Sequence, residues 1–117
     1  MSEKPCFLYI IGTVIDGVAT SPTKVGISAN PTGRLRELQV GSARKLMLCS
    51  MVMLDRRADA FGLEQEMHAT LAEWGMSGEW FDVCPLYATG VLFCDGVHFF
   101  GMQAANFQRA LGVEAHS

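Results

Sequence analysis

Two ten-residue segments of this chain are almost wholly apolar, and they limit what it can fold into. Residues 6–15 read CFLYIIGTVI, bounded by Pro5 and by Asp16-Gly17, and residues 45–54 read KLMLCSMVML. Short apolar runs of this length between turn residues are typical of buried β-strands. We therefore expect a sheet built on these two segments. The second is apolar enough to predict a central position in that sheet.

A further strand and a helix are expected between these two segments. Residues 16–23, DGVATSPT, are rich in turn formers and predict a loop or a wide hairpin. Residues 24–28 then predict a second short strand. Asn30 followed by Pro31 is a helix-start pattern, with Asn as the N-cap and Pro at the first helical position. This helix is expected to run to about Val40.

The second half of the chain is predicted to be mainly helical. Between residues 57 and 74 the apolar side chains recur at spacings of three and four, which indicates an amphipathic helix. Residues 78–81 predict a short extended piece. Residues 85–93 and 102–111 predict two further helices, with a glycine-containing apolar stretch at 95–101 between them.

These elements predict an α+β fold with a small three-stranded, mainly antiparallel sheet flanked by helices and a helical C-terminal tail. The chain has 117 residues, half of them apolar, so residues 1–117 are expected to form a single domain. No apolar run approaches the ~20 residues that a membrane span needs. The first ten residues lack the features of a secretory signal, so we expect a cytoplasmic protein with no membrane partner.

The charges are divided unevenly along the chain, whose net charge is −3. Residues 1–57 hold eight Lys and Arg against four acids, a net +4, whereas residues 58–117 hold one Arg against eight acids, a net −7. Such a division can present a basic face to phosphate on an acidic protein, or it can be a solvated surface of mixed charge. Charge alone leaves both interpretations open. The candidate nucleic-acid contacts in the basic half are Lys24, Arg34, Arg36, Arg44 and Lys45.

Five polar side chains beside these apolar patterns are candidates for chemistry. Glu64 and His68 are four residues apart on the amphipathic helix, so they share one face and flank its buried stripe. Arg34 lies near the start of the first helix, the end that favours phosphate. Tyr9 lies within the first strand, and Lys24 begins the second. Each has an ordinary alternative as well: a solvated glutamate, a partly buried histidine, a core tyrosine or a surface cation.

In their order along the chain, four stretches resemble the GIY-YIG nuclease superfamily. The stretches are FLYII, KVGIS, NPTGRLRELQVGS and LEQEMHATLAEWGMSGEWFDV. The resemblance is closest to the phage-type branch that includes the meiotically up-regulated gene 113 domain, and it covers roughly residues 7–83. It implies a core at about residues 6–83 with a C-terminal extension at 84–117.

The resemblance implies a metal-dependent endonuclease that hydrolyses phosphodiester bonds in DNA. Tyr9 would be the general base or would orient the attacking water, and Arg34 would stabilise the scissile phosphate. Glu64 would be the sole protein carboxylate on Mg²⁺, with Mn²⁺ as the alternative ion. Lys24 would occupy the place of the family's second tyrosine. Such a site is physically sensible, since a metal ion and an aimed cation both stabilise developing charge.

Three departures from the family pattern keep other functions open. Phe7 and Leu8 replace the glycine and isoleucine before the tyrosine, Lys24 replaces the second tyrosine, and Leu38 stands where some members carry a polar group that His68 could replace. The alternative is a catalytically weak nucleic-acid-binding module on the same fold. A dimeric interaction module is the third reading, and a homodimer is also compatible with a small nuclease that must cut two strands.

Overall fold

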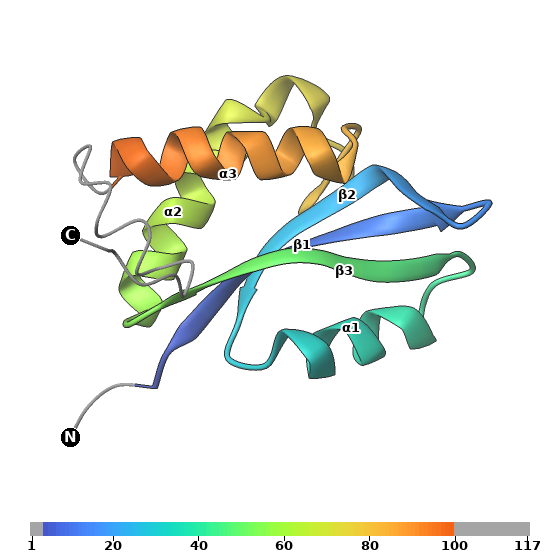
Figure 1. The fold of residues 1–117 in the computed structure, drawn as a ribbon, viewed down its shortest axis with the longest axis horizontal. Coiled ribbons are helices and arrows are strands. Elements are labelled where there is room, and N and C mark those ends of the chain that lie inside the picture. The colour runs from blue at the N-terminus through green and yellow to red at the C-terminus, as the bar shows by residue number, and fades with distance from the viewer. Residues whose placement is uncertain (1–3, 100–117) are drawn as a thin grey trace, which may run out of the picture.

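A four-stranded antiparallel sheet with helices on both faces forms the fold, in a computed structural model that describes residues 4–99 (Figure 1). The strand order is β3-β1-β2-β4. In chain order the elements are β1 (Cys6–Ile15), β2 (Val18–Ser28), α1 (Pro31–Val40), β3 (Lys45–Leu54), α2 (Arg57–Thr70), a 3₁₀ turn (Ala72–Trp74), β4 (Trp80–Phe81) and α3 (Pro85–Phe99). The predicted α+β class is confirmed. The short extended piece expected at 78–81 adds a fourth strand to the three that were predicted.

The hairpin between β1 and β2 is much tighter than the predicted loop over residues 16–23. Asp16 and Gly17 both have positive φ, 53° and 78°, and together they form a two-residue turn. Two-residue hairpin turns require this backbone conformation, which Asp-Gly adopts readily. β2 therefore begins at Val18, and Lys24 lies within the strand rather than at its start.

β3 lies at an edge of the sheet, so its predicted central position is wrong. The central strands are β1 and β2, and β1 pairs with both β2 and β3. One face of β3 is also partly open, because Met47, Met51 and Met53 remain 40–46% exposed. Apolar composition alone did not distinguish a strand covered on both faces from one with a partly open face.

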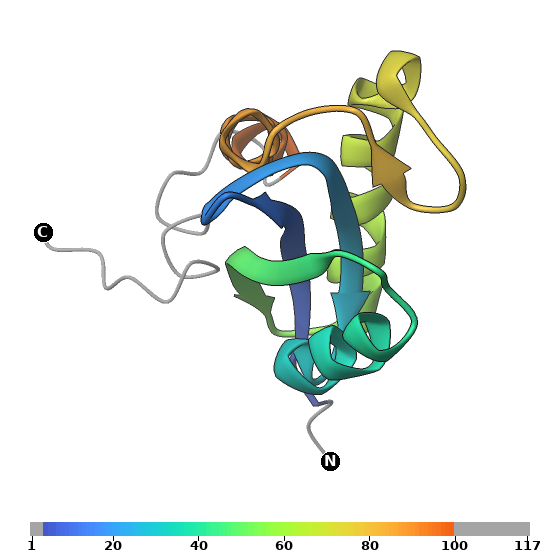
Figure 2. The ribbon, with the colours of Figure 1, turned by 90° about the vertical axis from the view of Figure 1, so that its right-hand side faces the viewer.

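The side chains on the two faces of β1 belong to two separate apolar clusters. Leu8 and Ile10 face the large core beneath α2 and α3, whereas Tyr9 and Ile11 face the smaller cluster on the α1 side. Figure 2 shows this arrangement, with α1 on one side of the sheet and α2 and α3 on the other. Because successive side chains of a strand point to opposite faces, this register fixes the direction of Tyr9.

The ends of α1 agree with the prediction. The Asn30 side chain accepts a hydrogen bond from the Gly33 amide at 3.2 Å, and Pro31 occupies the first turn. The helix ends at Val40, as expected. This cap sets the start of the helix that carries Arg34.

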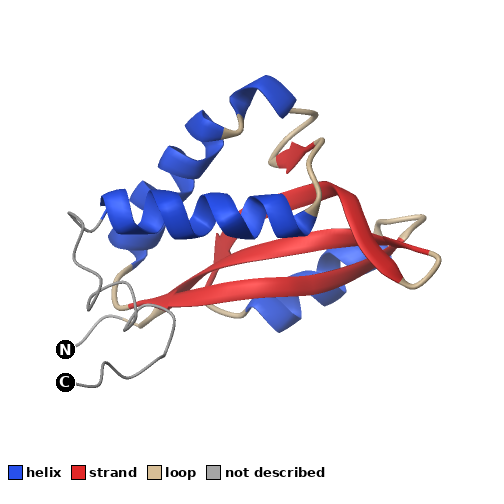
Figure 3. Ribbon diagram, turned by 45° about the horizontal axis from the view of Figure 1, so that its top comes forward, coloured by secondary structure: helices blue, strands red, loops and turns tan. Residues whose placement is uncertain are grey.

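α3 is longer than the sequence indicated. It continues through residues 95–99, part of the stretch expected to separate two helices, and it crosses α2 above the sheet (Figure 3). Ala88, Val91 and Leu92 of α3 belong to the large core. The helix expected at 102–111 lies outside the described residues. Among residues 4–99, no helix is long and apolar enough to cross a membrane.

Candidate active site at the edge of strand β2

The short length of β4 leaves part of β2 unpaired on its outer side. β4 pairs with β2 only at Thr23 and Lys24, and from Val25 onward no described strand continues along that edge. Helix α2 runs beside the edge instead (Figure 2). Side chains of α2 therefore meet the edge of β2 at the place where the sheet stops.

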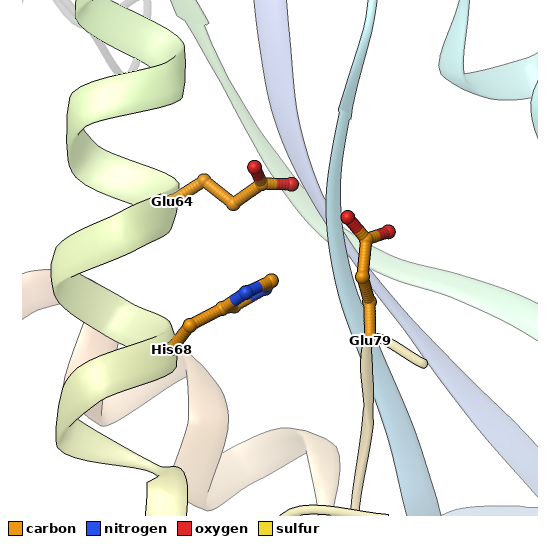
Figure 4. Close-up of side chains that lie close together, drawn as sticks. All are labelled: Glu64, His68 and Glu79. Atoms are coloured by element: carbon orange, nitrogen blue, oxygen red, sulfur yellow. The ribbon is translucent and has the colours of Figure 1, made fainter. Parts of the chain in front are cut away.

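Glu64, His68 and Glu79 converge at this edge. Glu64 and His68 extend from α2 toward Glu79, which directly precedes β4, with β2 behind them (Figure 4). One ligand atom from each of the three side chains lies within 4.8 Å of the other two. Two carboxylates and an imidazole at this separation could hold a metal ion.

The surroundings of Glu64 disfavour the ionised form of its carboxylate. Glu64 is only 4% exposed, and burial together with the nearby Glu79 charge raises its pKa, while His68 opposes the rise. A buried charge is stabilised by a proton or by a cation. The cluster could therefore accept a cation.

His68 is fixed by a backbone carbonyl of the exposed strand edge. Its Nε2 lies 2.9 Å from the Val25 carbonyl oxygen, and its ring packs against Phe81 at 5.1 Å between centroids. Since a carbonyl oxygen can only accept, Nε2 carries the hydrogen. The amide of the same Val25 donates to the Glu79 carbonyl at 3.2 Å, so one residue of β2 anchors both sides of the cluster.

Lys24 is buried and paired rather than exposed on the surface. It is 6% exposed, its Nζ lies 3.1 Å from Glu79 Oε2, and it stacks over the Trp80 ring at 5.7 Å. The ordinary interpretation of a surface cation is wrong for this residue. Lys24 places a fixed positive charge beside the carboxylate cluster.

Tyr9 reaches the same edge from the opposite face of the sheet. It pairs with Gly26 on β2, and a Cβ built on Gly26 would overlap the Tyr9 hydroxyl and ring. The ring therefore lies directly over the glycine. Burial raises the Tyr9 pKa and a hydrogen bond with Arg34 opposes this, while the Glu79 and Glu64 charges raise it further. The phenol of Tyr9 therefore lies within electrostatic range of both carboxylates, although its side chain begins on the other face of the sheet.

Arg34 completes the site from helix α1. It hydrogen-bonds with Tyr9, which raises the Arg34 pKa, and its guanidinium also pairs with Glu37 at 3.1 Å on the surface. Its side chain remains 42% exposed, so it faces both the phenol and the solvent. The structure thus brings together all five of the residues first selected from the sequence: Tyr9, Lys24, Arg34, Glu64 and His68.

The other basic candidates lie outside these contacts. Arg36, Arg44 and Lys45 are exposed on α1, on the loop that follows it and at the start of β3. None of them takes part in the hydrogen bonds or ion pairs that join the cluster. They are surface charges beside the site rather than parts of it.

Glu79 is the member of the cluster to which the sequence alone assigned no role. The residue belongs to the stretch SGEWF that contributed to the family resemblance, and this was the only indication of its importance. Its position depends on the short β4 strand and on the backbone hydrogen bond to Val25, neither of which spacing along the chain could predict.

The family to which this small domain belongs indicates a nuclease-related or DNA-binding class. A family model, the T5orf172 domain, matches residues 7–92, and the chain belongs to this family. The family is a phage-associated, nuclease-related domain. No curated protein and no solved structure matches the chain.

The contact between Tyr9 and Gly26 predicts the effect of a single methyl group. Gly26→Ala is expected to lower the free energy of unfolding by about 1–3 kcal/mol, because the added Cβ overlaps the Tyr9 ring. Urea denaturation measures the change. Gly90→Ala is the matched control, since a Cβ there meets no atom within 4 Å. Equal stability of Gly26→Ala and the wild type would show that Tyr9 does not lie over Gly26.

The raised pKa of Glu64 predicts a pH-dependent gain in stability for Glu64→Gln when divalent ions are absent. Between the ordinary pKa of 4.5 and the raised folded value, the folded chain binds more protons than the unfolded chain, so Glu64 destabilises the fold as pH rises. Denaturation at several pH values should show that the free energy of unfolding of the variant exceeds that of the wild type by more as pH rises through this window. The difference should be smallest below pH 4.5. Glu73→Gln, at an exposed position, should show no such trend. A gain that shrinks with rising pH would contradict the assignment.

Proposed function

We propose that this protein is a metal-dependent endonuclease of the GIY-YIG type that hydrolyses phosphodiester bonds in DNA. One observation carries the proposal: the Tyr9 hydroxyl and the Glu64 carboxylate approach the same edge of β2 from opposite faces of the sheet. Phosphodiester hydrolysis needs a group that orients water and a group that holds a cation, placed around one phosphate.

Glu64 and its neighbours are suited to hold Mg²⁺ or Mn²⁺. The buried Glu64 carboxylate and the partly exposed Glu79 carboxylate repel each other and fit a divalent cation, which would supply positive charge to the phosphate and to the leaving oxygen. Lys24 keeps Glu79 turned toward this position through their 3.1 Å ion pair. His68 is oriented by the Val25 carbonyl and forms the third side of the cluster.

Tyr9 acts on the attacking water in this proposal. Because its pKa is raised, the hydroxyl remains protonated at neutral pH and serves first to orient the water. The hydrogen bond with Arg34 opposes the rise, so Arg34 is the cation that assists any loss of the proton. In this proposal the phenol and the guanidinium act on the same reacting group.

Arg34 is also the residue that stabilises the scissile phosphate. Its ion pair with Glu37 is exposed on both sides and contributes little to stability. A phosphate oxygen can therefore replace the Glu37 carboxylate at small cost. Exposed Arg36, Arg44 and Lys45 extend the positive charge over neighbouring DNA phosphates, which predicts salt-sensitive binding.

A supercoiled-plasmid nicking assay with Mg²⁺ or Mn²⁺ tests the proposal. The wild type should nick the plasmid, Glu64→Gln should abolish nicking, and Arg34→Ala should lower the rate by about 10²–10³-fold because charge on the phosphate loses its partner. Glu73→Gln is the matched control and should nick like the wild type.

Two results would overturn the proposal. Nicking that survives Glu64→Gln would come from another enzyme in the preparation. Salt-sensitive DNA binding without any cleavage, unchanged in Glu64→Gln, would assign the chain to the alternative class of DNA-binding modules.

A further inference from the structure

The cluster at the edge of β2 contains more ligands than a site with one protein carboxylate needs. We infer that Glu64, Glu79 and His68 all ligate the ion, and that the site takes a first-row transition-metal dication in preference to Mg²⁺. This inference rests on the proposed metal site of the nuclease and extends it to the ligand set and the class of ion. It differs from the expectation that Glu64 alone would bind Mg²⁺.

The hydrogen bond of His68 prepares its imidazole to be a ligand. Nε2–H donates to the Val25 carbonyl at 2.9 Å, so the unshared electron pair lies on the other ring nitrogen, Nδ1. Metal-bound histidines in proteins almost always donate their second ring N–H to a carbonyl or carboxylate in this way. The ring is also packed against Phe81, which limits its rotation.

Glu79 is held in the cluster by contacts on both its backbone and its side chain. The Glu79 carbonyl accepts a hydrogen bond from the Val25 amide at 3.2 Å, and Lys24 Nζ donates to Glu79 Oε2 at 3.1 Å. Lys24 neutralises one of the two carboxylate charges, which leaves a net negative site when Glu64 is ionised and His68 is neutral. That charge attracts a dication.

The mixture of oxygen and nitrogen ligands determines which dication is preferred. Mg²⁺ is bound by oxygen and retains most of its water, whereas imidazole is a ligand for first-row transition metals. A site for Mg²⁺ would gain nothing from His68. An ion that accepts nitrogen gains a third protein bond.

Mn²⁺ binding to the metal-free full-length chain tests the inference without relying on catalysis. Pulsed electron paramagnetic resonance of the wild type with Mn²⁺ should show coupling to a nitrogen nucleus from a bound imidazole. In calorimetric titrations Mn²⁺ should bind more tightly than Mg²⁺. His68→Gln should weaken Mn²⁺ by about 10–100-fold and leave Mg²⁺ nearly unchanged. His98→Gln, whose imidazole is 77% exposed and contacts Glu66 outside the cluster, is the control and should bind Mn²⁺ like the wild type.

The wild-type spectrum decides the inference even if a variant fails to fold. Absence of nitrogen coupling, absence of Mn²⁺ binding, or equal affinity for Mn²⁺ and Mg²⁺ would each overturn it. These results are separable from the nuclease proposal. A protein that nicks DNA with Mg²⁺ but shows no nitrogen coupling remains a nuclease and refutes the three-ligand site. A protein that shows the coupling but cuts no DNA supports the ion site and refutes the nuclease.

Discussion

The packing of the Tyr9 ring over Gly26 is the contact on which the rest of the site depends. The side chains of β1 alternate between two apolar clusters, so Tyr9 begins on the α1 side of the sheet while Glu64 begins on the α2 side. Only a residue without a Cβ at position 26 lets the phenol cross β2 and approach the carboxylates. At Gly26, strand β2 therefore lets a side chain from one face of the sheet approach side chains on the other face.

The electrostatics of the site follow from where the sheet ends. Because β4 pairs with only two residues of β2, the backbone N–H and C=O of the next residue, Val25, are bonded by Glu79 and His68 instead of by a strand. Glu64 is then buried beside a second carboxylate, which raises its pKa and costs stability. Lys24 places positive charge beside Glu79, and Arg34 places positive charge beside Tyr9. A structural core gains nothing from such an arrangement, whereas the proposed site for a cation and a phosphate would use it.

Much of the fold was predictable because local chemistry determines it. The bounds of β1 and β3 follow from apolar runs between turn residues, and α1 follows from the Asn30 cap with Pro31. One error concerns long-range arrangement, the edge position of β3. Two others are local: the tight Asp16-Gly17 turn, which puts Lys24 inside β2 rather than at its start, and the continuation of α3 to Phe99. In the site, Tyr9, Arg34 and Glu64 could be selected through a family resemblance. Glu79 could not be assigned a role, because its position depends on tertiary contacts.

The proposed function requires one cation position between Glu64 and the edge of β2, close to the Tyr9 hydroxyl. Anomalous diffraction from a crystal of the full chain soaked in Mn²⁺ tests this most directly. One strong anomalous peak is expected between the Glu64 carboxylate, His68 and Glu79, on the side that Tyr9 faces. A peak elsewhere, with no ion at the edge of β2, would contradict it.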